Sequence, residues 1–154
     1  MNFEYEKTDL NLYRAIFFDN YSEDVSSYLK PDEELANAEI TAPILHPTWT
    51  NNGIRPADIK VNLDDRLYHP NTGGTSTFDR ANVLRRADGD FLIPEGTPIP
   101  PDLIVQEDGW SKRLKATHHT IMPSKPMSKN YLKSQLDNFV RSAIAKQYEN
   151  ARGN

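Results

Sequence analysis

An apolar stripe at helical spacing near the C-terminus constrains this chain more than any other feature. Apolar side chains recur every three or four positions between residues 131 and 150: Leu132, Leu136, Phe139, Val140, Ala143, Ile144 and Tyr148. This spacing places one face of a helix against a core. Gly153 follows at a position where helices commonly end. We therefore predict a helix over residues 131–150 that packs through this stripe.

Upstream of this helix, short apolar runs between turn residues predict strands. The predicted strands cover residues 10–18, 91–93, 103–106 and 117–122. Two short helices are predicted over residues 32–39 and 75–86, because Pro31 and Thr75 are suitable residues for a helix start. Residues 43–74 are rich in Pro, Gly, Asn and Asp, which predicts a long, partly irregular connection.

Length and composition exclude several classes of protein. A chain of 154 residues fits one domain, residues 1–154. It has no cysteine, which excludes disulfides, thiol nucleophiles and cysteine-bound zinc. Its apolar runs are too short for a transmembrane helix, and its first six residues do not resemble a signal peptide. Its four histidines are scattered, so no metal is expected.

Charge is distributed unevenly along the chain. The formal net charge is −4, with acidic residues in excess over residues 1–70 and basic residues in excess over residues 71–154. The basic half could face a phosphate or an acidic protein. Its charge density is low for a protein that binds duplex DNA, although a nucleic-acid target is not excluded.

Arg14 is the first candidate functional residue. The period of two in a strand places it on the same face as Leu12 and Ile16, where a charge must be paired. Its guanidinium could pair with a core carboxylate or clamp a bound phosphate, and the sequence leaves both alternatives open.

The run Gly73-Gly74-Thr75-Ser76-Thr77 is the second candidate. Glycines permit close approach of a ligand, and hydroxyls at a helix start could donate to an anion. The alternative is an ordinary turn and helix cap. No Gly-Lys-Ser/Thr follows, so the run is not a P-loop.

His118 and His119 are the third candidate. Adjacent residues of a strand point to opposite faces, so at most one of them can line a given site. Either could be a structural histidine. A nucleophilic pair of Ser76 with His118 stays formally open, although no G-x-S-x-G motif supports it.

Motifs along the whole chain resemble those of one toxin family. They are EYEKT at 4–8, LYRA at 12–15, TGGTS at 72–76, FDRA at 78–81, VLRRADGDF at 83–91, IP at 93–94, PPDL at 100–103, ATH at 116–118, TIMP at 120–123 and LDNFVR at 136–141. In this order they resemble the second exported effector of the bacterial type VI secretion system. The likeness is weakest in residues 47–68.

The resemblance implies an α+β fold similar to the catalytic domains of mono-ADP-ribosyltransferase toxins, with small β-sheets around an NAD cleft and flanking helices. It implies a toxin made in the donor cytoplasm and exported through the Hcp ring of the secretion system. The toxin would act in the recipient cytoplasm, consume NAD without a metal, and be neutralised by a cognate immunity protein.

The resemblance also implies roles for individual residues. ADP-ribosyltransferases combine a first-strand Arg, a middle Ser/Thr motif and a late catalytic Glu. Arg14 with Tyr13 matches the first, and the run from Gly74 through Thr75 and Ser76 to Thr77 resembles the second. The expected cofactor contacts are thus Arg14, Tyr13, Gly74, Thr75 and Thr77, and the expected catalytic residues are Thr75, Ser76 and His118.

The late Glu has no clear counterpart. His118 falls at that stage of the chain. Glu107 is the nearest glutamate, but the residues around it do not match the family's pattern. ADP-ribosyl transfer and NAD hydrolysis therefore both stay open. The alternative to an enzyme is a toxin that binds and blocks a cytoplasmic target without turnover.

Overall fold

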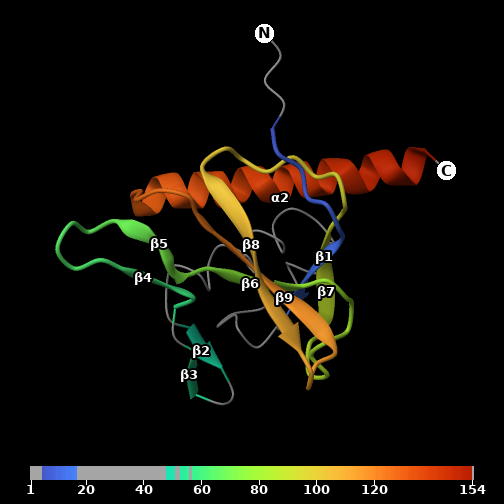
Figure 1. Ribbon diagram of the computed structural model, residues 1–154, viewed down its shortest axis with the longest axis horizontal. Coiled ribbons are helices and arrows are strands. Elements are labelled where there is room, and N and C mark those ends of the chain that lie inside the picture. Colours follow the sequence, from blue (N-terminus) through green and yellow to red (C-terminus); the bar gives the residue numbers. More distant parts are fainter. Residues whose placement is uncertain (1–4, 17–47, 51–52, 56, 154) are drawn as a thin grey trace, which may run out of the picture.

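A five-stranded antiparallel sheet is the centre of the fold (Figure 1). The computed structural model describes residues 5–16, 48–50, 53–55 and 57–153. The sheet has the order β7-β1-β6-β9-β8. Its strands are β1 (Leu12–Ile16), β6 (Thr75–Phe78), β7 (Gly89–Ile93), β8 (Leu103–Ser111) and β9 (Ala116–Pro123). The strands predicted from the sequence are thus confirmed, although β7, β8 and β9 are longer than expected and residues 17–18 lie outside the described residues.

Two short antiparallel ladders lie within the segment that was predicted to be irregular. β2 (Thr48–Thr50) pairs with β3 (Gly53–Arg55), and β4 (Ile59–Val61) pairs with β5 (Tyr68–Gly73). The described part of residues 43–74 is therefore largely strand and tight turn. The prediction of a partly irregular connection was wrong for this part, because its strands are too short to show a clear alternation.

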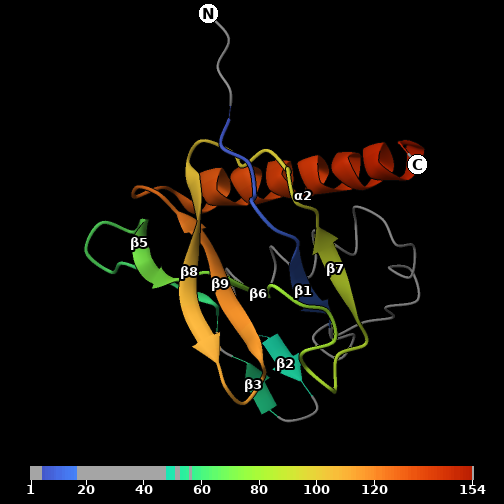
Figure 2. The ribbon, with the colours of Figure 1, turned by 45° about the vertical axis from the view of Figure 1, so that its right-hand side comes forward.

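The C-terminal helix α2 (Lys129–Arg152) is the element that the sequence predicts best. Ser128 caps it, since the Ser128 hydroxyl accepts a hydrogen bond from the Tyr131 backbone N–H at 3.2 Å. Figure 2 shows the helix crossing one end of the sheet. Its buried apolar residues, Leu132, Leu136, Phe139, Val140 and Ala143, form one core with sheet residues that include Leu12, Ile93 and Ile121. The structure therefore has the predicted α+β character, and no helix among the described residues is long and apolar enough to cross a membrane.

One member of the predicted stripe does not join this core. The side chain of Tyr148 is 69% exposed. Gln147 takes the next position along the buried face and donates from Nε2 to the Leu92 carbonyl oxygen at 2.6 Å. Inclusion of Tyr148 in the stripe was therefore wrong, because the core-facing line of the helix passes through its neighbour.

The helix predicted over residues 75–86 is also wrong. Residues 75–78 form strand β6, which pairs with β1 on one side and β9 on the other, and turns follow up to residue 88. Pairing on both sides overrides the cap-like pattern of Thr75, and β-branched threonines favour a strand. The helix predicted over residues 32–39 lies outside the described residues.

Gly73 and Gly74 allow β6 to pack closely against its neighbours. Gly73 has a φ of +117°, which side chains rarely adopt. A Cβ atom on Gly74 would lie 2.2 Å from the Ile121 carbonyl oxygen, and the Gly74 N–H donates to the Asp58 carbonyl oxygen at 3.0 Å. Both glycines therefore face backbone atoms of the protein and not open space.

The substitution Gly74→Ala should lower the free energy of unfolding by about 3 kcal/mol, because the new methyl group overlaps the backbone of β9. Denaturant unfolding monitored by circular dichroism measures this change. Gly89→Ala is the matched control, since nothing lies within 4 Å of the Cβ added there, and it should change the value by less than about 1 kcal/mol. Equal effects of the two substitutions would contradict this account of Gly74.

Candidate functional site

Strand register separates the candidate residues onto two faces of the sheet. Directly paired residues share a face, and the pairs Ser76–Thr120 and Phe78–His118 alternate with Thr77–His119. We call the face that carries Leu12 and packs against α2 the inner face. The opposite face is the outer face.

The inner face holds Arg14, Thr75, Thr77 and His119. Arg14 is 5% exposed and donates from Nη1 to the Ser76 carbonyl oxygen at 3.0 Å. Its Nη2 lies 3.5 Å from Oδ2 of Asp58, which confirms that this charge is paired in a buried position. Both threonines are fully buried, and the Thr77 hydroxyl donates to the His119 carbonyl oxygen at 3.0 Å.

The outer face holds Tyr13, Ser76 and His118. Tyr13 pairs with Phe78, and the rings of Phe78 and His118 meet edge to face with centroids 5.2 Å apart. The prediction that His118 and His119 point to opposite faces is confirmed. The register places His119, and not His118, on the face of Arg14. To decide which histidine shares a face with Arg14, one must know how β1, β6 and β9 pair. The periodicity of a single strand does not supply this information.

A hydrogen-bonded cluster surrounds His118. Its Nδ1 lies 2.6 Å from Oδ2 of Asp108, and the Thr120 hydroxyl donates to the same oxygen. Gln106 donates from Nε2 to Oδ1 of Asp108 at 3.3 Å. The side chains of His118 and Asp108 are 29% and 30% exposed, so the cluster is open to solvent.

Asp108 is the residue that sequence reasoning missed. The register of β8 shifts between Glu107 and Gly109, which leaves Asp108 in a bulge of this strand. The bulge directs the Asp108 carboxylate toward β9, where two hydroxyl or imidazole donors are available. The Asp-Gly pair at positions 108–109 is a visible turn signal, but such a pair does not distinguish the end of a strand from a bulge within one.

The cluster changes the acidity of Asp108. Partial burial opposes the charged carboxylate, but hydrogen bonds from Thr120 and His118 and the charge of His118 outweigh burial and lower the pKa of Asp108. A carboxylate that accepts from Nδ1 fixes the imidazole tautomer and leaves Nε2 as a proton acceptor. The arrangement therefore suits general-base chemistry on the outer face.

Two other arrangements considered from the sequence are not assembled in the described part of the structure. No hydrogen bond joins Ser76 to His118 there. Glu107, the acidic residue considered as the late catalytic Glu, lies on the edge strand β8 and is 72% exposed. Its Oε1 lies 3.9 Å from Nε2 of His119, and not beside His118. Within the described ranges, no group of three or more His, Asp or Glu side chains could hold a metal ion.

Comparison with known proteins relates this chain to a toxin family. The sequence model of the family described as Tse2 ADP-ribosyltransferase toxin matches residues 9–148. A protein named Toxin Tse2 from Pseudomonas aeruginosa PAO1 is 59% identical over 158 residues, and the alignment covers 99% of each chain.

The Asp108 cluster should make stability depend on pH in acid. A lowered pKa means that the Asp108 carboxylate stabilises the fold above its unfolded pKa of about 4, and that this contribution disappears as pH falls through the lower folded value. The wild type should therefore exceed Asp108→Asn in melting temperature most at neutral pH. The difference should shrink below about pH 4. A difference that grows on acidification would contradict the assignment.

Proposed function

Because this chain belongs to the family of Tse2 ADP-ribosyltransferase toxins, we propose that it is an antibacterial toxin that cleaves NAD at the outer face of its central sheet. The observation that carries this proposal is the hydrogen bond between His118 and Asp108. His118 would act as general base, Asp108 would position it, and Ser76 and Tyr13 lie on the same face within reach of a bound substrate.

The proposed reaction needs one proton acceptor. His118 takes the proton of an acceptor hydroxyl, or of water, at Nε2. The freed oxygen forms a bond to the ribose C1′ of NAD while the C1′–N bond to nicotinamide breaks, and nicotinamide leaves as a neutral molecule. An acceptor hydroxyl gives ADP-ribosyl transfer, and water gives hydrolysis. The nearby Asp108 carboxylate stabilises the imidazolium that forms on His118. Its negative charge therefore acts on the histidine, whereas the late Glu of ADP-ribosyltransferases would act on the substrate directly.

Arg14, Thr75, Thr77 and Gly74 are proposed to serve NAD binding, as the family resemblance implies. The register sets a condition on this part of the proposal. Arg14 and the two threonines lie on the inner face, whereas His118 lies on the outer face. A direct contact of NAD with Arg14 would therefore require the substrate to enter between the central sheet and the segment around Asp58.

The wider biology of the toxin is also a proposal. We propose export by a type VI secretion system through the Hcp ring, action in the recipient cytoplasm, and neutralisation by a cognate immunity protein. The relative named Toxin Tse2 supports the toxin part of this proposal. An immunity protein that covers the outer face would protect residues 105–120 from hydrogen exchange, and one that binds elsewhere would leave them unchanged.

The role of His118 is tested by substitution. His118→Ala should lower NAD consumption by about 100-fold or more, and His118→Gln should retain more activity because it keeps a polar side chain of similar reach. Asp108→Asn should give a smaller loss. The matched control His119→Ala removes the neighbouring histidine from the other face. Melting temperatures are measured beside activity, and a His118→Ala protein that is inactive only because it is unfolded would contradict the assignment.

The role of Arg14 is tested by NAD binding. Arg14→Lys keeps the charge but loses the planar fork, so a phosphate clamp predicts at least about tenfold weaker binding of NAD in titration calorimetry. A purely structural Arg14 predicts a lower melting temperature with unchanged binding. Unchanged binding would contradict a contact between Arg14 and NAD and would leave the outer face as the proposed binding surface.

Labelled NAD incubated with the toxin and a bacterial lysate identifies the reaction. Label on a macromolecule supports transfer, and free ADP-ribose supports hydrolysis. Toxicity without either product would favour the alternative of a toxin that blocks its target by binding.

A further inference from the structure

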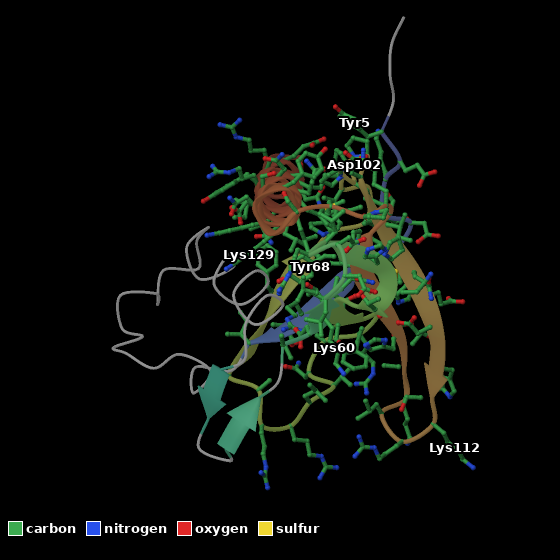
Figure 3. The ribbon with its side chains drawn as sticks, turned by 90° about the vertical axis from the view of Figure 1, so that its left-hand side faces the viewer. Tyr5, Lys60, Tyr68, Asp102, Lys112 and Lys129 are labelled. Carbon is green, nitrogen blue, oxygen red and sulfur yellow. The ribbon has the colours of Figure 1, made fainter. Side chains whose placement is uncertain are left out.

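A groove lined by basic side chains lies at the end of the sheet away from α2. Its volume is about 760 Å³, and two segments form its walls: residues 80–86, after β6, and residues 113–115, in the turn between β8 and β9. Figure 3 shows Lys112 at the tip of this hairpin, far from the helix. The charged lining residues are Arg80, Arg85, Arg86, Arg113 and Lys115, and no carboxylate is among the lining residues.

Arg80 holds the two walls together. It donates from Nε to the Lys115 carbonyl oxygen at 3.2 Å and from Nη2 to the Leu114 carbonyl oxygen at 2.7 Å. The groove is thus fixed by hydrogen bonds within the protein. Two wall residues, Asn82 and Lys115, have positive φ angles of 59° and 53°, so the walls follow tight turns.

The other four cations are exposed and free of ion pairs. Arg85, Arg86, Arg113 and Lys115 form no salt bridge in the described part of the chain. Like charges repel, so such a cluster destabilises the empty protein slightly. The carboxylates beside the walls, Asp79 and Asp90, accept hydrogen bonds from the backbone N–H groups of Thr117 and Asn82. Salt screens charges beyond about 8 Å at physiological ionic strength, so a ligand in the groove would experience this local positive charge despite the net charge of −4.

We propose that this groove binds the phosphate backbone of a single-stranded nucleic acid. Guanidinium groups match phosphate oxygens in pairs, and three of the four unpaired cations are arginines. Trp110 on the same hairpin pairs with Thr117 and lies outside the groove lining, on the face opposite to His118. It is 64% exposed, so a strand that leaves the groove along the edge strand could stack a base on its ring. A basic channel with an exposed aromatic ring is typical of proteins that bind single strands.

The groove adjoins the proposed catalytic cluster. Phe78 pairs with His118, and at the next position Asp79 and Thr117 are joined by two hydrogen bonds, of 3.2 and 2.8 Å. The groove begins directly beyond them, at Arg80 and Lys115. A strand bound there would pass close to His118 and could present a hydroxyl as acceptor. This acceptor role rests on the proposed function, whereas the binding does not.

Binding is measured by fluorescence anisotropy with a labelled single-stranded RNA of about 12 nucleotides and the purified full-length chain. Arg85→Gln/Arg86→Gln should weaken binding by about tenfold and should reduce the slope of log K against log salt by about 1.4. Arg113→Gln on the opposite wall should also weaken binding. The matched control Arg66→Gln/Arg152→Gln removes two exposed arginines elsewhere and should have little effect.

Several outcomes would overturn the proposal. One is the absence of salt-dependent RNA binding, and another is an equal loss of RNA affinity in the groove and control variants. A third is displacement of the RNA by polyglutamate at equal charge concentration, which would indicate an acidic protein as the partner. The catalytic variant His118→Gln separates this proposal from the proposed function. It should bind RNA like the wild type, so failure of catalysis with intact binding would affect the proposed function alone.

Discussion

The close packing of β6 between β1 and β9 is the constraint on which the rest of the structure depends. Gly74 permits this approach because any side chain there would overlap the Ile121 carbonyl oxygen. Arg14 adds a second restraint, since it reaches from β1 to the carbonyl oxygen of Ser76 and to Asp58. Every candidate site residue lies on one of these three strands or is held by them. The positions of the candidate residues are therefore set by backbone packing.

The sequence predicts the elements of this fold better than their mutual arrangement. The stripe of α2 and the short strands follow from periodicity, because one face of each is buried against the same core. Residues 75–78 show the limit of local reasoning. Thr75 suits a helix cap, but two flanking strands select an extended conformation. The pattern within residues 75–78 does not show that β1 and β9 will lie on either side of them.

The candidate site shows the same limit. Periodicity correctly separates His118 from His119, but it cannot say which of them shares a face with Arg14, because that depends on register across three strands. Asp108 was missed for a related reason, since a bulge has no fixed periodicity. The excess of basic residues after position 70 was visible in the sequence. Only the fold shows that five of these cations line one groove.

The bulge in β8 has a consequence for association between copies of the chain. β8 is an edge strand of the central sheet, and a long regular edge offers unpaired backbone groups to any other strand. The shift between Glu107 and Gly109 breaks the regular spacing of those groups, and the exposed charge of Glu107 on this edge disfavours pairing with another strand. The irregularity that brings Asp108 to His118 thus also protects the sheet against edge-to-edge aggregation.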